Sequence, residues 1–453
     1  MAGNKPAAAS SCAAQKTTIT MSEQHGSRQN PKRKLRALII STGGPRQSHM
    51  EELFAHPDVS EHFEPPVFTP GVSSRSLRSR VDFLKAANQA GLLPKAEWEA
   101  MQAARESPFY QKDINTGKLF DCLCDVPVEQ GRKGSEVDVK LHYSVELWRK
   151  AKTVNRGRAV LGCTLAHLIA MKKCVSEDFD IILEDNVRAP PAECALRIRE
   201  AALSSQEQAT TYGIDCHMRY FGWLGSRPNL QWIFESYRKP EAYQRLSTDT
   251  DHSEYTTFPL PTTKDIVQSL KLAEEAKADD REALDDPGSA DSTELRKPGG
   301  TAPVWGAYAY WVSKEAYEGL MEVLRIDVGA LMWKSKRARY YTVKPIDKVI
   351  PRQIMSRFGQ TSIQIATHPT FFRAPMLTSK IHSQWDPEFC KSTEYQLKQV
   401  GLEWSDLWLT ETERSVVLHH QLHGEWLTPA QLEEWRMKGA GASAVQAGLE
   451  TQS

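Results

Sequence analysis

The sequence of 453 residues lacks a long apolar run and has no surplus of charge of either sign. No apolar run approaches the ~20 residues that a membrane-spanning helix requires, so we expect no transmembrane segment. Lys and Arg together number 57, as do Asp and Glu, which gives a formal net charge of zero. A general nucleic-acid-binding protein carries a basic surplus, so we expect no nucleic-acid partner.

The sequence also lacks a secretory signal and an organised cysteine framework. Residues 1–33 are rich in small and polar residues and contain no apolar h-region, which indicates a disordered tail rather than a signal peptide. The eight cysteines are widely scattered, which is typical of reduced thiols. These absences predict a cytoplasmic protein, and they leave the secretory pathway or an organelle open.

What the sequence does contain indicates an α/β protein. Apolar residues make up 40% of the chain, enough for a substantial core. Strand, helix and strand patterns over residues 35–71 predict a βαβ-type start. Further strands are expected at 181–183, 220–225, 304–312 and 363–366. We therefore predict a mixed, mostly parallel sheet flanked by helices, followed by a C-terminal helical extension.

The composition divides the chain into parts of different character. The disordered tail, residues 1–33, precedes a main domain at 34–375. Within that domain, the least regular stretch, about 238–300, contains an acidic run and is interpreted as a surface insertion. Helical, Trp-rich patterns at 376–438 predict the C-terminal extension, and the small residues of 439–453 predict a flexible tail.

The region 145–171 predicts a long, mainly helical segment, interrupted near Gly157 and Gly162. Thr164 is a plausible N-cap for its second part. His167 lies off the apolar stripe of this segment, so it is free to point away from the core. A lone histidine in a helix is either a hydrogen-bonded structural residue, which is the commoner case, or a catalytic one.

The most informative stretch is an apolar run, Ile181–Leu183, that ends in Glu184, Asp185 and Asn186. A continuous apolar run suits a central strand buried on both faces. Open α/β sheets bind ligands at the carboxyl ends of their strands, and hard divalent cations prefer oxygen ligands. The stretch therefore predicts a metal–nucleotide site. The alternative is a solvated acidic turn after a strand.

A loop of small residues follows the first predicted strand, with the sequence Ser-Thr-Gly-Gly-Pro-Arg at residues 41–46. Small residues let a backbone approach a ligand closely. The loop is not a P-loop, because the spaced Gly-Lys-Ser/Thr is missing. Thr42, Gly43 and Arg46 are its candidate contacts to a bound nucleotide.

Four segments, in order along the chain, resemble segments of glycosyltransferase family 25, which includes bacterial lipooligosaccharide galactosyltransferases and procollagen galactosyltransferases. Residues 161–167 resemble the family's Gly-Cys-x-x-Ser-His element, with Ala166 where serine is usual. Residues 182–187 resemble its strand ending in Glu-Asp-Asp. Residues 305–314 are similar to its Gly-x-x-Ala-Tyr-x-Ile-Ser segment, and residues 344–348 to its Pro-x-Asp element.

The resemblance covers roughly residues 35–370, although the first strand lacks the family's Asn-Leu-x-x-Arg signature. It implies a GT-A-like, Rossmann-type fold. It also implies inverting transfer of a hexose, usually galactose or glucose, from a UDP-sugar donor to a hydroxyl of a glycan or protein acceptor. A divalent cation, first of all Mn²⁺, is the implied cofactor.

The resemblance also assigns residues to roles. Glu184, Asp185 and Asn186 occupy the metal–diphosphate motif of the family. Asp347 occupies its acidic position after proline, and His167 occupies the position of its histidine. We therefore treat Glu184 and Asp185 as donor contacts as well as candidate metal ligands.

An inverting transfer needs a carboxylate to take the proton of the acceptor hydroxyl. Asp347 is the first candidate for this base or for an acceptor clamp, and Asp327 is the second. His167 completes the catalytic candidates. Trp305 and Tyr308 are candidates to stack on the donor, although aromatic strand residues more often belong to a core.

Asn186 departs from the family pattern, because an amide offers an oxygen but no charge to a cation. Three alternatives stay open: Asp185 is the ligand, the metal binds weakly, or the site is degenerate. A degenerate site predicts a non-catalytic protein that binds a nucleotide sugar or a carbohydrate. A third class of function is a metal-dependent hydrolase of the donor.

Overall fold

The computed structural model describes the residues 33–73, 76–77, 80–92, 126–129, 140–141, 151–212, 215–225, 227–237, 257–259, 304–324, 332–334, 340–343, 346–373, 387–427 and 429–437. The predicted tails, except Arg33, lie outside these residues, as do Asp327 and most of the predicted insertion. Lys34–Ser453 group into a single unit by their contacts.

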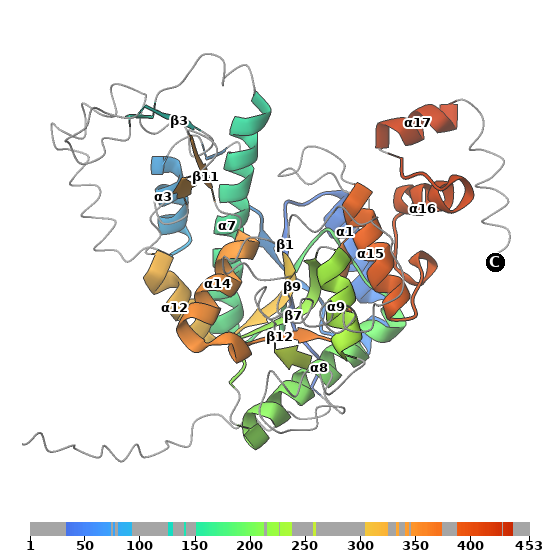
Figure 1. Cartoon of the computed structure of the whole chain (residues 1–453), viewed down its shortest axis with the longest axis horizontal. Helices are drawn as coiled ribbons and strands as arrows, with labels where there is room; N and C mark the ends of the chain where they lie inside the picture. The colour runs from blue at the N-terminus through green and yellow to red at the C-terminus, as the bar shows by residue number, and fades with distance from the viewer. Residues whose placement is uncertain are drawn as a thin grey trace, which may run out of the picture. The chain divides into compact units, whose positions relative to one another are not determined.

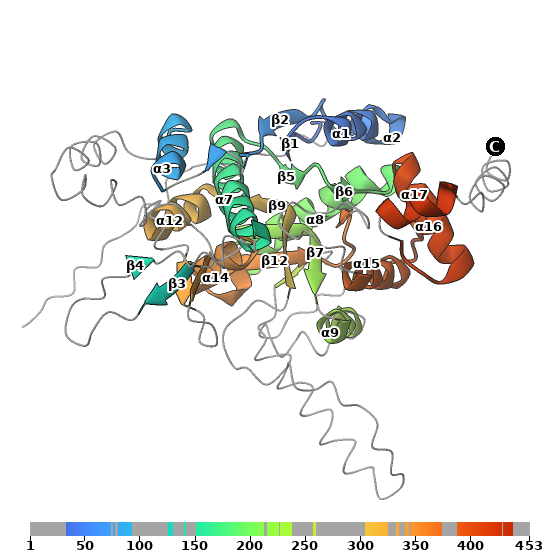
Figure 2. The same cartoon turned by 90° about the horizontal axis from the view of Figure 1, so that it is seen from above.

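A seven-stranded sheet forms the centre of this unit, in the order β2-β1-β5-β9-β7-β12-β8 (Figures 1 and 2). β2, β1, β5, β7 and β12 run in one direction, while β9 and β8 run against them. The strands are β1 (Ala37–Ser41), β2 (Val67–Pro70), β5 (Ile181–Glu184), β7 (Met218–Gly225), β8 (Thr257–Pro259), β9 (Val304–Val312) and β12 (Ile363–Ala366). The predicted α/β class with a mixed, mostly parallel sheet is confirmed.

Helices flank both faces of this sheet. α7, α12 and α14 pack on one face, and α1 and α8 pack on the other (Figure 1). α9 and α15 pack against β7. The helices are α1 (Pro45–Ala55), α2 (Pro57–Ser60), α3 (Arg80–Gln89), α7 (Ala151–Glu177), α8 (Pro191–Tyr212), α9 (Arg227–Tyr237), α12 (Lys314–Leu324), α14 (Ile346–Phe358), α15 (Pro387–Gln399), α16 (Glu411–His423) and α17 (Pro429–Met437).

Smaller strands complete the described part of the chain. An antiparallel sheet in the order β10-β11-β3-β4 contains β3 (Val126–Glu129), β4 (Lys140–Leu141), β10 (Met332–Lys334) and β11 (Tyr340–Val343). β6 (Val187–Arg188) pairs with β13 (Phe372–Arg373), two strands that are far apart in the sequence. β8 lies within the predicted insertion and forms an edge strand on β12, which the sequence analysis did not foresee.

The central strand β5 is buried on both faces, as predicted. Ile182 faces the helix α7 side, whereas Ile181 and Leu183 face the side of α1 and α8. All three side chains have zero exposure. Burying each contributes roughly 1.5–3 kcal/mol, so the position of β5 in the sheet is strongly specified. The same alternation directs Glu184, two residues after Ile182, toward α7.

The prediction of an interrupted helix near residues 157–164 is wrong. α7 continues through Gly157 and Gly162, and Thr164 lies inside it and donates from its hydroxyl to the Val160 carbonyl at 2.9 Å. A Cβ atom on Gly162 would lie 2.6 Å from the Val72 carbonyl oxygen. Gly162 therefore allows a neighbouring backbone to pack closely against α7, which is a tertiary reason for a glycine in a helix interior.

Part of α7 also meets the length and composition criteria of a membrane span. Among the described residues, Ala159–Glu177 is the one stretch that does so, and 67% of it is buried within the protein. A core helix of a globular domain passes the same test. The sequence analysis predicted a helix in this region but did not consider it as a membrane span. The absence of a transmembrane segment stays a prediction.

The C-terminal helices pack directly on the sheet domain. The Gln396 side chain of α15 donates to the Trp223 carbonyl at 2.8 Å, and the Trp408 backbone donates to the Ala189 carbonyl at 3.0 Å. α16 begins with a capping box, in which the Thr410 side chain accepts from the Glu413 N–H and the Glu413 side chain accepts from the Thr410 N–H. α17 begins at Pro429, a residue favoured in the first turn of a helix.

Candidate functional site

The carboxyl end of β5 lies beside the carboxyl end of β1. The two strands are parallel, with Ile40 opposite Glu184, and the Asp185 backbone donates to the Ile40 carbonyl at 3.1 Å. The loop that follows β1 is therefore held next to the acidic turn that follows β5. Residues about 140 positions apart in the sequence meet at this edge of the sheet.

Asp185 faces the loop after β1. The Ser41 hydroxyl donates to its carboxylate at 2.7 Å, and Arg46 Nη1 lies 3.7 Å from its other oxygen. The Gly43 backbone donates to the Ser41 hydroxyl at 3.0 Å, which fixes the loop relative to Asp185. Asp185 is buried and Thr42 is exposed in the same loop. Four of the residues predicted to bind the donor or the cation are thus neighbours.

The loop adopts a backbone that requires glycine. Gly43 has φ 81°, and Gly44, the N-cap of α1, has φ 76° and ψ −157°. Side chains with a Cβ atom rarely adopt such conformations. No described atom lies within 4 Å of a Cβ built on either glycine, so space is open beside the loop. The loop leads into the first turn of α1, where Pro45 brings no N–H group and Gln47 donates to the Gly44 carbonyl at 2.9 Å, so the helix dipole rather than a set of free donors favours an anion here.

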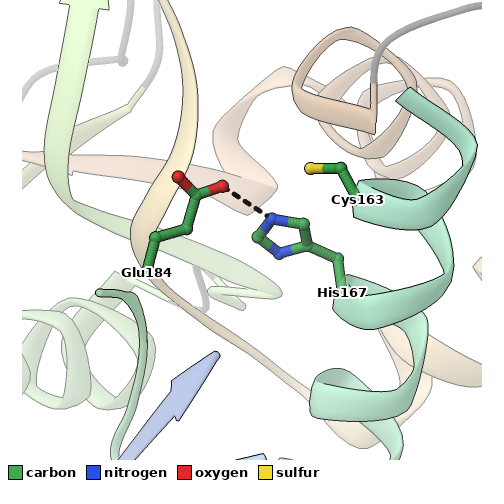
Figure 3. Close-up of side chains that lie close together, drawn as sticks. All are labelled: Cys163, His167 and Glu184. Carbon is green, nitrogen blue, oxygen red and sulfur yellow. Dashed lines mark hydrogen bonds and ion pairs between the residues drawn. The ribbon is translucent and has the colours of Figure 1, made fainter. Parts of the chain in front are cut away.

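Glu184 faces the other way, toward α7, where it meets His167 (Figure 3). His167 Nε2 lies 3.0 Å from a Glu184 carboxylate oxygen, and His167 Nδ1 lies 2.9 Å from the Tyr310 hydroxyl. The His167 side chain is 1% exposed, whereas that of Glu184 is 25% exposed. His167 is thus a buried, fully hydrogen-bonded residue that holds Glu184 in position.

The environment of Glu184 favours its ionised form. Burial by itself raises the pKa of Glu184, but hydrogen bonds from His167 and Asn186, together with the positive charge of Arg373, outweigh burial and lower the pKa overall. Asn186 therefore supports the charge of Glu184 through its amide. Its carbonyl oxygen is buried and makes no hydrogen bond within the part of the chain that the structure describes.

Asp347 lies in the first turn of α14, and its pKa is raised, in contrast to that of Glu184. Burial and the nearby Glu184 carboxylate raise the pKa of Asp347, and this rise exceeds the lowering by Lys348, His167 and Arg373. One Asp347 oxygen is buried without a hydrogen-bond partner among the described residues. Asp347 is therefore electrostatically coupled to Glu184, as an acid–base group near the predicted cation ligands would be.

Strand β9 brings the predicted aromatic residues to the same edge. Ile182 pairs with Tyr310 and Leu183 with Ala309, so one further step of this register brings Tyr308 level with Glu184. The Tyr308 hydroxyl is buried and has no hydrogen-bond partner among the described residues. Trp305 lies further along β9, partly buried against the apolar cluster on the α1 side.

The sequence analysis missed two side chains of this site, those of Ser41 and Arg373. Ser41 was quoted only as part of the loop, and its hydroxyl gave no signal of its own. Arg373 comes from the two-residue strand β13, which pairs opposite Val187 of β6. No local pattern identifies such a short strand, so its position follows from the tertiary structure alone.

The described geometry defines an α/β protein with polar groups gathered at the carboxyl edge of its central strands. Comparison with protein-family models finds no matching family. Comparisons with curated proteins and with solved structures find no match. The resemblance to glycosyltransferase family 25 therefore rests on the four sequence segments.

Proposed function

We propose that the protein is a glycosyltransferase of GT-A-like fold that moves a hexose from a UDP-sugar to a hydroxyl of a glycan or protein acceptor. One observation carries the proposal. The loop after β1, the acidic turn after β5 and the first turn of α14 bring Arg46, Asp185, Glu184 and Asp347 to one edge of a mixed, mostly parallel sheet. Ligands of open α/β sheets bind at this edge.

The loop at residues 41–46 supports a role in binding the diphosphate of the donor. The open space beside Gly43 and Gly44 lets the backbone approach a ligand. The positive end of the α1 dipole points toward the loop, and Arg46 adds a positive charge beside it. Both features favour a negatively charged group at this position.

The turn after β5 fits a hard divalent cation such as Mn²⁺. Asp185 would be its main ligand, assisted by Asn186, whose buried carbonyl oxygen lacks a hydrogen-bond partner among the described residues. These are oxygen ligands, which such cations prefer. Glu184, predicted as a third ligand, faces α7 instead and would contribute only its charge. When bound, the cation would neutralise the leaving diphosphate.

Asp347 is our proposed base for the acceptor hydroxyl. Because its pKa is raised by burial and by Glu184, its carboxylate is a stronger proton acceptor than an exposed aspartate. His167 is a positioning residue, since it contacts Glu184 and Tyr310 in the protein interior. Asp327, the second candidate base, lies outside the described residues.

The proposal is tested by incubating the protein with UDP-hexoses, Mn²⁺ and a broad mixture of acceptors. We expect release of UDP and acceptors that gain the mass of one hexose. Asp185→Ala should abolish both, whereas Asp58→Ala, which removes an exposed carboxylate in α2, should leave both unchanged. Equal release by Asp185→Ala would contradict the assignment, and free hexose formed without any acceptor would indicate a hydrolase.

A second candidate function is binding of a nucleotide sugar without catalysis. The contacts of Asp185 favour it, because Ser41 and Arg46 already compensate this carboxylate and Asn186 brings no charge. A thermal-shift measurement with UDP separates the two functions. Stabilisation by UDP that requires Mn²⁺ supports the transferase, and equal stabilisation without Mn²⁺ supports the binding protein.

A further inference from the structure

A second group of side chains lies on the α7 side of β5. Cys163 and His167 are four residues apart in α7 and so share one face of the helix. Glu184 approaches them from the end of β5 (Figure 3). The thiol sulfur, an imidazole nitrogen and a carboxylate oxygen of these residues all lie within 4.8 Å of one another. Three donor atoms of different chemistry thus converge from two elements.

The hydrogen bonds around this cluster suit a metal ligand set. A ligating histidine is normally held by a hydrogen bond from its other ring nitrogen. The Tyr310 hydroxyl lies 2.9 Å from His167 Nδ1 and supplies this partner, which leaves Nε2 directed toward Glu184. Asn186 in turn donates to the Glu184 carboxylate. Both potential ligands are therefore oriented by a further residue.

Charge around the cluster favours a cation. The Cys163 thiol interacts electrostatically with two carboxylates, those of Glu184 and Asp347, and with one opposing cation, Arg373. One buried Asp347 oxygen has no hydrogen-bond partner among the described residues. A divalent ion would balance this negative charge.

The same residues do not form a nucleophilic triad. In such a triad one ring nitrogen of the histidine contacts the nucleophile and the other contacts the acid. Here Tyr310 occupies Nδ1 and Glu184 occupies Nε2, so neither nitrogen of His167 serves the Cys163 thiol. The arrangement therefore does not fit nucleophilic catalysis by Cys163, whereas it does bring three metal-ligating atoms together.

We propose that Cys163, His167 and Glu184 bind Zn²⁺ through three protein ligands, with a water at the fourth position. Mixed sulfur, nitrogen and oxygen ligands in a four-coordinate site are typical of zinc, whereas Mn²⁺ and Mg²⁺ prefer oxygen. Binding replaces the Cys163 thiol proton, which passes to the solvent, and His167 binds as the neutral imidazole, so the Nε2 proton that it donates to Glu184 is exchanged for one on Nδ1 that is donated to the Tyr310 hydroxyl. The site goes beyond the proposed transfer and does not require it, since Asp185 is held on the opposite side by Ser41 and Arg46.

The site is tested with Co²⁺, which reports sulfur ligation through a thiolate-to-metal charge-transfer absorption band. Full-length protein is first freed of metal with a chelator and then titrated. We expect one Co²⁺ to bind per chain with this band, and Zn²⁺ to displace it because zinc binds such sites more tightly. Cys163→Ser should remove the band and weaken Co²⁺ binding by about tenfold or more.

Cys174→Ser is the matched control, because Cys174 is a buried thiol of the same helix that donates to the Phe179 carbonyl. It should keep the band, as should Asp185→Asn, which separates this site from the proposed transferase cation. Circular dichroism of the metal-free variants verifies folding. A wild-type titration without the band, or a band that survives Cys163→Ser, would overturn the proposal.

Discussion

At the scale of single residues, the pKa values of two neighbouring carboxyl groups, Glu184 and Asp347, are shifted in opposite directions. The hydrogen bonds of His167 and Asn186 lower the pKa of Glu184, while burial and the charge of Glu184 raise the pKa of Asp347. Pairs of titratable groups separated in this way are typical of acid–base sites. One carboxylate is kept ionised, and the other gains the ability to accept a proton.

Asp347→Asn tests this pair. If Asp347 is the base, the rate of hexose transfer should fall by about 10²–10⁴-fold, because an amide accepts no proton. In the wild-type protein the rate should rise with pH through the raised pKa of Asp347, and the residual rate of the variant should lack this rise. Transfer rates across a pH series check both statements.

Stability provides the control for the same substitution. Because the pKa of Asp347 is raised in the folded protein, the wild type loses stability as pH increases from the ordinary carboxyl pKa through this raised pKa. Asp347→Asn should therefore be at least as stable as the wild type at neutral pH, with the difference vanishing in acid. A variant that loses activity and also unfolds at lower temperature at pH 7 would contradict this interpretation.

At the scale of elements, the β1–α1 connection is the part of the site that the backbone itself builds. Gly43 and Gly44 both have positive φ, and Gly44 combines it with an extended ψ that is nearly restricted to glycine. The conformation turns the chain from β1 into α1 within three residues. It thereby places the first turn of α1 beside Asp185.

Gly44→Ala should lower the free energy of unfolding by about 1–3 kcal/mol through backbone strain and should also weaken UDP binding. Gly359→Ala is the control, since Gly359 has φ 89° in the connection after α14 and also has open space around its Cβ position. It should lose stability but keep UDP binding. Urea denaturation and UDP thermal shifts measure the two properties. Unchanged UDP binding in Gly44→Ala would remove the loop from the donor site.

At the scale of the whole molecule, a buried ion pair joins the C-terminal helices to the sheet domain. Arg188 Nε lies 2.7 Å from a Glu413 oxygen, and both side chains are at most 2% exposed. Arg188 also donates to the Val187 and Asp185 carbonyls, next to the candidate site. The packing of α16 is therefore connected to the turn that carries Asp185.

Glu413→Gln should destabilise the protein by about 3–5 kcal/mol, because it leaves the Arg188 charge buried and uncompensated. Glu193→Gln, which breaks an exposed pair with Arg197, should change stability by less than about 1 kcal/mol. Replacing both members of the buried pair, Arg188→Met with Glu413→Leu, should recover much of the loss. Urea midpoints of the variants measure these effects, and a Glu413→Gln midpoint equal to that of Glu193→Gln would refute the role of the pair.

Local sequence patterns determined the main elements of the fold. The apolar run of β5 and the aromatic run of β9 specify buried strands because their side chains leave no polar face. Ser313 marks the start of α12, where its hydroxyl accepts from the Ala316 backbone at 3.1 Å. The acidic turn and the glycine loop were also visible, because both interrupt apolar patterns with residues of special chemistry.

The sequence by itself determined which residues carry reactive groups and that Glu184 and Asp185 end a buried strand. Only the tertiary structure decided that these two carboxylates have different partners, Glu184 with His167 and Asp185 with Ser41 and Arg46. It also decided the position of Arg373 and the continuity of α7 through Gly162. The physical reason is that strand alternation and close packing are set by distant segments, whose register no local pattern encodes.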